Sequence, residues 1–161
     1  MPKKIDPLNK KNINAVTAML TVRDIKAAVR FYQKAFGFTK RGIHNGPDGK
    51  AIHAELRLRD TVLMLGPEYP EFGSRSANTL QGTPVTLYLM AESADKVFAR
   101  AVKLGATPTQ PVMDMFWGDR CGTVTDPDGN KWMIATHKAE PTPQEMKKKM
   151  AEQMAASAAK A

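Results

Sequence analysis

The sequence has little cysteine and no long apolar run. Cys121 is the single cysteine, so no disulfide forms within the chain, and a zinc site built on paired cysteines is excluded. No stretch approaches the roughly 20 apolar residues that a helix needs to cross a bilayer, and no signal-peptide pattern follows the N-terminus. We therefore expect a cytoplasmic protein with no membrane partner. Packing explains Cys121 better than catalysis, because its local motif holds no base.

Aromatic residues are also sparse, at 7% of the chain, and they do not alternate with basic residues as in a nucleic-acid stacking surface. The net charge is +8, of which residues 1–12 carry +3 and residues 140–161 carry +1. Between these ends both signs are interspersed. Solvated ends explain much of the excess, so we expect no nucleic-acid partner.

The hydrophobic fraction of 42% is that of an ordinary globular domain. Residues 1–13 are polar and predict a flexible arm. A β-favouring run then ends at Asp24, a good N-cap for a helix over 25–36 whose apolar residues follow a 3.6-residue period. Gly37 can end this helix in the left-handed conformation. Alternating apolar residues predict strands over 51–58 and 61–66.

The same pattern then starts again. Residues 67–83 are rich in turn formers and predict a linker. A strand over 85–90 follows, and Ser93 caps a helix over 94–104 that Gly105 ends. Two further strands are predicted at residues 122–125 and 131–135.

An internal repeat organises these elements. Shifting the sequence by 69 places Asp24 on Ser93 and Met64 on Met133. The two helix-ending glycines are 68 apart, which indicates a small deletion in the second helix. The pattern predicts repeat one over 14–66 and repeat two over 84–138, in one α+β domain over 14–138.

The remaining segment, 139–161, predicts a C-terminal helix. Thr142 and Glu145 form a capping box, and the residues that follow are strong helix formers. Met146, Met150 and Met154 fall on one face. We expect this helix to pack on its own domain or on a second subunit.

Several of these motifs resemble the glyoxalase, bleomycin-resistance and extradiol-dioxygenase superfamily, also called the vicinal oxygen chelate fold. The resemblance covers about 14–138 and rests on Leu20-Thr21-Val22-Arg23-Asp24, Phe36-Gly37-Phe38 and Asp126-Pro127-Asp128-Gly129-Asn130. The stretches His53–Arg57 and Phe116–Arg120 look like an uncharacterised bacterial subgroup. The resemblance implies two βαβββ repeats forming a curled mixed sheet around a cup, with helices outside, in a homodimer.

Metal-dependent members of that superfamily take ligands from the first and last strand of each repeat. Carried over strand by strand, those positions are Thr17, Met64, Thr86 and Met133. Hydroxyl and thioether groups are poor ligands for the ions this chemistry uses. We therefore expect no metal at these positions and no cofactor.

Other residues suggest a ligand site. His53 and Glu55 stand two residues apart on a strand and therefore point to one face. One hypothesis is that they form a relocated metal site with His137. Another is that His53 or Glu55 acts as a general base. The alternative is that Glu55 pairs with an arginine. Trp117 and Arg120 are suited to contact a planar or anionic ligand. The alternative is that the Trp117 indole is buried and that Arg120 forms a surface ion pair. The predicted ligand-contacting residues are Thr17, Met19, His53, Glu55, Met64, Thr86, Tyr88, Trp117, Arg120 and Met133.

Three functions remain open on this evidence. The first is a metal-free protein that binds a small aromatic or anionic compound in the cup. The second is a metal-dependent glyoxalase-like or dioxygenase-like lyase or isomerase that uses His53, Glu55 and His137. The third is a metal-free enzyme with a carboxylate or imidazole base. The lack of good metal-ligating side chains at Thr17, Met64, Thr86 and Met133 favours the first function.

Overall fold

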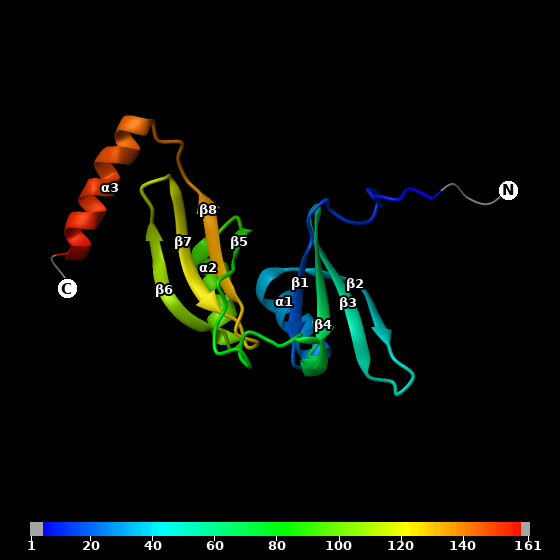
Figure 1. Cartoon of the computed structure of the whole chain (residues 1–161). Coiled ribbons are helices and arrows are strands. Elements are labelled where there is room, and N and C mark those ends of the chain that lie inside the picture. The colour runs from blue at the N-terminus through cyan, green and yellow to red at the C-terminus, as the bar shows by residue number, and fades with distance from the viewer. Residues whose placement is uncertain (1–4, 159–161) are drawn as a thin grey trace. The chain divides into compact units, whose positions relative to one another are not determined.

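A computed structural model describes residues 5–158 of the protein, and these residues form two compact units. The first comprises the described residues up to Thr83 together with Pro127–Gly129, and the second comprises Pro84–Asp126 and the described residues from Asn130 onward. Within the first, the elements are β1 (Ala18–Val22), α1 (Ile25–Phe36), β2 (Thr39–Asn45), β3 (Ala51–Leu58), β4 (Thr61–Pro67) and the short 3-10 helix η1 (Pro70–Phe72) (Figure 1).

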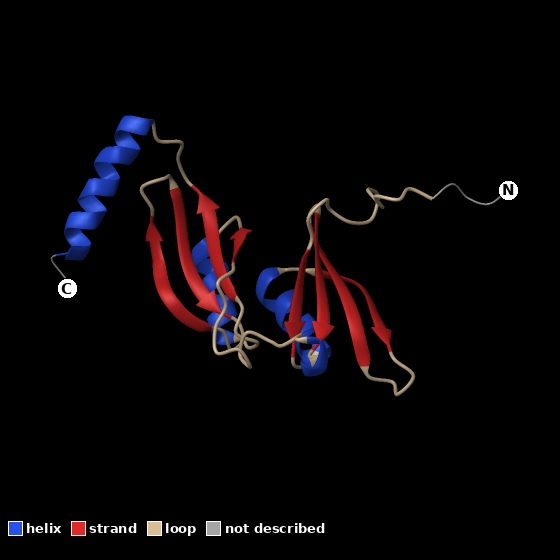
Figure 2. Cartoon of the chain, in the orientation of Figure 1, coloured by secondary structure: helices blue, strands red, loops and turns tan. Residues whose placement is uncertain are grey.

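The second unit repeats this order. It contains β5 (Thr86–Met90), α2 (Ala94–Lys103), β6 (Thr107–Asp114), β7 (Asp119–Thr125), β8 (Lys131–His137) and the C-terminal helix α3 (Pro143–Ala158) (Figure 2). No helix among the described residues is long and apolar enough to span a membrane.

The helix boundaries follow the predicted caps. The Asp24 side chain accepts a hydrogen bond from the Ala27 amide at 2.9 Å, and Gly37 ends α1 with φ of 81°. The Ser93 hydroxyl accepts from the Lys96 amide at 3.3 Å in the same way. Gly105 has a positive φ two residues beyond the end of α2. Both predicted N-caps are confirmed.

Strand pairing confirms the repeat. The strand orders are β1-β4-β3-β2 and β5-β8-β7-β6. In the parallel ladders Met19 is opposite Met64 and Tyr88 is opposite Met133, so the shift of 69 converts one pair into the other. The α+β class is confirmed. Across residues 5–158 every ladder joins strands of one unit. Each repeat therefore forms its own four-stranded sheet, and the two repeats do not share a single hydrogen-bonded sheet.

Each sheet has one face covered by its own helix and an opposite face, called here the open face. In the first unit Ala54 and Leu56 are buried on the α1 side, whereas His53, Glu55 and Arg57 alternate with them and are partly exposed. In the second unit the α2 side holds Gly122, which lies against the Phe98 ring, and buried Val124, Trp132 and Ile134. On β3 the polar side chains of His53, Glu55 and Arg57 therefore lie on the open face.

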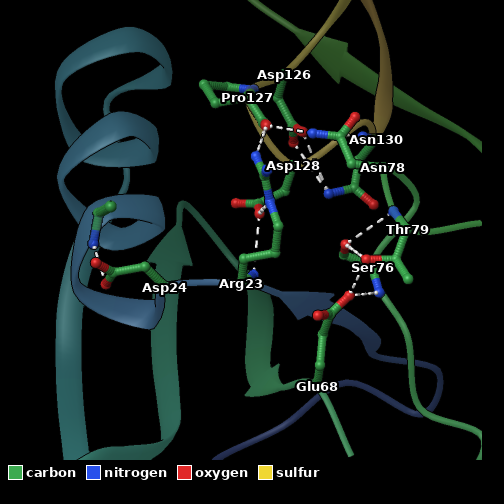
Figure 3. A network of polar contacts seen from close by, with 11 residues as sticks. Arg23, Asp24, Glu68, Ser76, Asn78, Thr79, Asp126, Pro127, Asp128 and Asn130 are labelled. Carbon is green, nitrogen blue, oxygen red and sulfur yellow. Dashed lines mark hydrogen bonds and ion pairs between the residues drawn. The ribbon is translucent and has the colours of Figure 1, made fainter. Parts of the chain in front are cut away.

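The linker is held by polar contacts in the first unit (Figure 3). Glu68 accepts hydrogen bonds from the Thr79 hydroxyl at 2.5 Å and the Ser76 amide at 2.8 Å, which lower the pKa of Glu68 to about 2. Asn78 donates its side-chain amide to the Pro127 carbonyl at 2.7 Å, and Arg23 pairs with Asp128. The linker and the tip of the β7–β8 turn are thus joined within one unit.

The C-terminal helix has its predicted capping box. Glu145 accepts from the Thr142 amide and hydroxyl at 2.8 and 2.9 Å, and its own amide donates to the Thr142 oxygen. None of the described residues of α3 is buried. Gln153 donates to the Asp114 carbonyl, and a shallow groove lies between Phe116 and the methionines at 150 and 154. The helix therefore touches its own unit and leaves much of its apolar face exposed.

Replacing Gly129 tests how firmly the turn tip is seated. Gly129 has φ of 89°, and a Cβ there would lie 2.6 Å from the Asn78 amide nitrogen. Gly49 has a similar φ of 76° but no atom within 4 Å of a Cβ. We expect Gly49→Ala to cost about 1–2 kcal/mol through left-handed strain alone. Gly129→Ala should cost at least about 1 kcal/mol more in urea unfolding. Equal losses would show that the tip is not packed against the linker.

Candidate functional site

A hydrogen-bonded cluster of aromatic and ionisable side chains lies on the open face of the second sheet. Asp119 begins β7 and His137 ends β8, and the two are directly opposite in the antiparallel ladder. Tyr88 projects from β5, which pairs with β8 on its other side. Trp117 lies in the turn between β6 and β7. Strand register therefore brings together residues from four separate segments.

The Asp119 carboxylate is the centre of this cluster. One oxygen, Oδ1, is 2.9 Å from His137 Nδ1. The other, Oδ2, accepts from the Tyr88 hydroxyl at 2.6 Å and from the Trp117 indole nitrogen at 3.2 Å. The Asp119 side chain is 13% exposed, whereas that of His137 is 53% exposed. Three donors thus fix a nearly buried carboxylate, and the groups around it face outward.

The electrostatics of the cluster follow from these bonds. Partial burial disfavours ionisation of Asp119, but its hydrogen bonds from Tyr88, His137 and Trp117 outweigh this and lower its pKa. The bond to Asp119 raises the pKa of His137. Burial, aided by the hydrogen bond to Asp119, raises the pKa of Tyr88 to about 12. Burial and the Asp119 charge also raise the pKa of the Cys121 thiol, which is therefore not activated as a nucleophile.

Gly118 explains how Trp117 and Asp119 are presented together. It has φ of 103°, and a Cβ there would collide with the carbonyl of Ala139. Its own carbonyl accepts hydrogen bonds from the amides of Lys138 and Ala139, each at 3.0 Å. The β6–β7 turn is thus fastened to the segment that follows His137, which holds both ends of the cluster in place.

Arg120 lies on the other face of the sheet. Its guanidinium contacts Asp95 of α2 at 2.8 and 2.9 Å and Asp114 of β6 at 3.2 Å. The sequence had left open a ligand contact or an ion pair for Arg120. The structure places it in an ion pair on the helix-covered side, away from Tyr88 and Trp117.

The predicted residues of the first unit form a second, looser group. His53 Nε2 is 3.7 Å from Glu55 Oε1, and Glu55 Oε2 is 3.1 Å from Arg41. Glu55 therefore pairs with an arginine, as one reading of the sequence proposed. His44 lies on β2 opposite His53, with ring centroids 5.9 Å apart.

The positions inherited from the metal-dependent pattern do not suit a metal. Thr17 donates its hydroxyl to the Asn14 carbonyl, and Thr86 is exposed. Met64 and Met133 lie on open faces opposite Met19 and Tyr88. Two hydroxyls and two thioethers are a poor donor set for a hard divalent ion. Within residues 5–158, no three His, Cys, Asp or Glu side chains are arranged to hold a metal ion.

Asp119 was missed as a site residue in the sequence, although a signal for it exists. The Asp126–Asn130 turn fixes the β7–β8 register, with Thr125 opposite Lys131. Counting back from the turn in steps of two places Asp119 opposite His137 on one face. Tyr88 was among the predicted ligand contacts, but its bond to Asp119 was not predicted.

These features define an α+β protein of paired βαβββ units, and comparisons with known proteins agree. A sequence model of the Glyoxalase/Bleomycin resistance protein/Dioxygenase superfamily matches residues 13–134. Uncharacterised proteins of Mycobacterium bovis and Mycobacterium tuberculosis are 41% identical over 123 residues, which is 74% of this chain and 81% and 72% of theirs. The chain belongs to the Glyoxalase/Bleomycin resistance protein/Dioxygenase superfamily.

Solved structures show the same fold. TioX from Micromonospora sp. ML1 has a TM-score of 0.60 at 24% identity, covering 76% of this chain and 97% of that one. A gene product from Arabidopsis thaliana has a TM-score of 0.62 at 28% identity, covering 76% and 98%. The fosfomycin resistance protein FosX from Mesorhizobium loti has a TM-score of 0.57 at 14% identity, covering 82% and 95%. The fold therefore occurs in proteins with different names, one of them a fosfomycin resistance protein.

The Asp119–His137 pair should give stability a distinct pH dependence. Since the pKa of Asp119 is lowered, its contribution is present above about pH 4 and is lost as pH falls through the folded pKa. Since the pKa of His137 is raised, its contribution is present below about pH 6.5 and is lost as pH rises through the folded pKa. The coupling between Asp119→Asn and His137→Gln, from urea unfolding, should be largest between these limits. A coupling that does not vary with pH would contradict the ion pair.

Proposed function

We propose that the chain is a metal-independent protein that binds a small organic compound on the open face of its second unit. The observation that carries this proposal is the cluster of Tyr88, Trp117 and His137 around a nearly buried Asp119. Functional sites commonly combine apolar and aromatic surface with a few fixed polar groups. The cluster supplies both in one place.

The apolar part of this surface is substantial. Tyr88 is 48% exposed although its hydroxyl is bonded inward, so its ring is presented to solvent. Met133 is opposite Tyr88 in the ladder and is partly exposed. Trp117 packs edge-on against Phe116 with centroids 5.0 Å apart, which supports the indole. A flat aromatic compound would bury part of the Tyr88 ring and contact the adjacent thioether.

The polar part favours orientation of a ligand rather than metal chemistry. Both Asp119 oxygens are already engaged by protein donors. Thr86 and Met133, the inherited positions of this unit, supply no strong ligand. Metal-dependent lyase or isomerase activity is the alternative, and the Glu55–Arg41 pair counts against it because it occupies the one carboxylate proposed for a relocated site. A homodimer in the cytoplasm remains part of the proposal.

Tryptophan fluorescence provides a direct test. The chain has two tryptophans, and Trp132 is 3% exposed with its indole nitrogen bonded to Asp126 at 2.9 Å. We expect planar aromatic compounds to quench the fluorescence of Trp117 in a saturable way. Trp117→Phe should leave a fluorescence that ligand does not change, because Trp132 is enclosed.

A matched pair of variants locates the ligand. Tyr88→Ala should weaken binding by roughly tenfold through loss of an aromatic contact. Arg120→Gln lies on the opposite face and should leave the affinity unchanged. The proposal fails if no compound quenches Trp117, or if Tyr88→Ala leaves the affinity intact.

A further inference from the structure

We propose that His137 accepts a proton from the compound bound beside it, so that the ligand class is planar weak acids such as phenols and enols. This inference rests on the proposed function, because it assigns a role to the same site. It is carried by the orientation of one imidazole ring and by what each of its nitrogens faces.

Asp119 determines which nitrogen of His137 carries hydrogen. The carboxylate accepts at both oxygens, from Tyr88 and Trp117 on Oδ2 and from His137 on Oδ1. An ionised carboxylate is an acceptor only, so the hydrogen in the 2.9 Å bond is on Nδ1. In the neutral ring the lone pair is then on Nε2.

Nε2 is available to a ligand. The His137 side chain is 53% exposed, and Nε2 is 3.7 Å from Glu140 Oε1, a distance that gives an ion pair when the ring is protonated but no hydrogen bond to the neutral ring. Glu140 is 91% exposed and belongs to the segment after β8, so a ligand can displace it. The ionisable groups around the ring are thus Asp119 from β7, Glu140 on the following segment, and Tyr88 from β5 through Asp119.

Tyr88 is not the acceptor. Its hydroxyl proton is donated to Asp119 at 2.6 Å, and with a pKa of about 12 it stays protonated at neutral pH. Tyr88 therefore has two roles that do not compete with His137. It holds the carboxylate in place through its hydroxyl, and it offers its ring as a surface for a flat ligand.

The transfer balances as a simple acid–base step. The O–H bond of the ligand breaks, its electron pair remains on oxygen, and a new N–H bond forms at Nε2. The imidazolium still donates its Nδ1 hydrogen to Asp119. Its positive charge lies between that carboxylate and the ligand anion. No oxidant, reductant or leaving group is needed.

4-Nitrophenol is a suitable probe, because its anion absorbs visible light and its own pKa lies near neutrality. On binding, its pKa should fall by about 1 unit or more, since a positive charge forms next to the anion. Only the neutral ring can accept the proton, so the anion fraction of the bound probe should exceed that of the free probe at pH values above the folded-state pKa of His137. The measurement is a pH titration of absorbance with protein in excess.

Variants separate proton acceptance from binding. His137→Gln should abolish the pKa shift while quenching of Trp117 by the probe persists, and His137→Asn provides a second variant of the same exposed residue. Asp119→Asn should reduce the shift, because Asp119 positions the ring, and should move the pH profile as well. His44→Gln removes an exposed histidine from β2 of the first unit and should change neither measurement.

The outcomes are distinct. A shift that persists in both His137 variants, or a probe that binds wild-type protein but stays neutral, overturns the inference. If other aromatic compounds quench Trp117 and no nitrophenol binds or ionises, the binding site stands and the proton acceptor falls. If nothing quenches Trp117, the proposed function falls with it.

Discussion

The buried carboxylate of Asp126 holds the β7–β8 turn, on which the arrangement of the second unit depends. Asp126 is 4% exposed, and it accepts hydrogen bonds from the Asn130 amide at 2.9 Å and the Trp132 indole at 2.9 Å. These bonds close the turn between β7 and β8 around Gly129. A closed turn fixes the register of the two strands, because a slip of one residue would turn every side chain to the opposite face. That register is what places Asp119 beside His137.

The two faces of the second sheet also differ in role, since one packs against α2 and the other presents the candidate site. The face toward α2 is filled by apolar side chains and by the Arg120 ion pairs with Asp95 and Asp114. Arg120 therefore links β7 to α2 and β6 on the face opposite the candidate site. The open face is left to Tyr88, Asp119 and His137, whose hydrogen bonds orient the groups without covering them. An imidazole aligned by a carboxylate, next to an aromatic ring, can both orient an organic molecule and exchange a proton with it.

Much of the fold was predictable because its signals are local. Asp24 and Ser93 are caps whose side chains act within three residues, and the shift of 69 reflects a ladder register that both units share. The separation of the strands into two sheets was not predictable, because no local pattern says which edge strands pair. Trp117 and Tyr88 were already among the ligand contacts predicted from the sequence, and that role remains a prediction. Their common partner Asp119 depends on an exact register, and the opposite facing of Arg120 depends on strand alternation near an irregular turn.

Binding of a small organic ligand without a metal ion is the property that we propose for this member of the superfamily. The most direct measurement is the affinity for the aromatic compound that quenches Trp117 most strongly, in three forms of the protein. These are protein as purified, protein treated exhaustively with a chelator, and treated protein resupplied with Mn²⁺, Fe²⁺, Ni²⁺ or Zn²⁺. Equal affinity in all three is the predicted result, because Thr17, Met64, Thr86 and Met133 offer no adequate donor set. Affinity that disappears on chelation and returns with one of these ions would contradict the account.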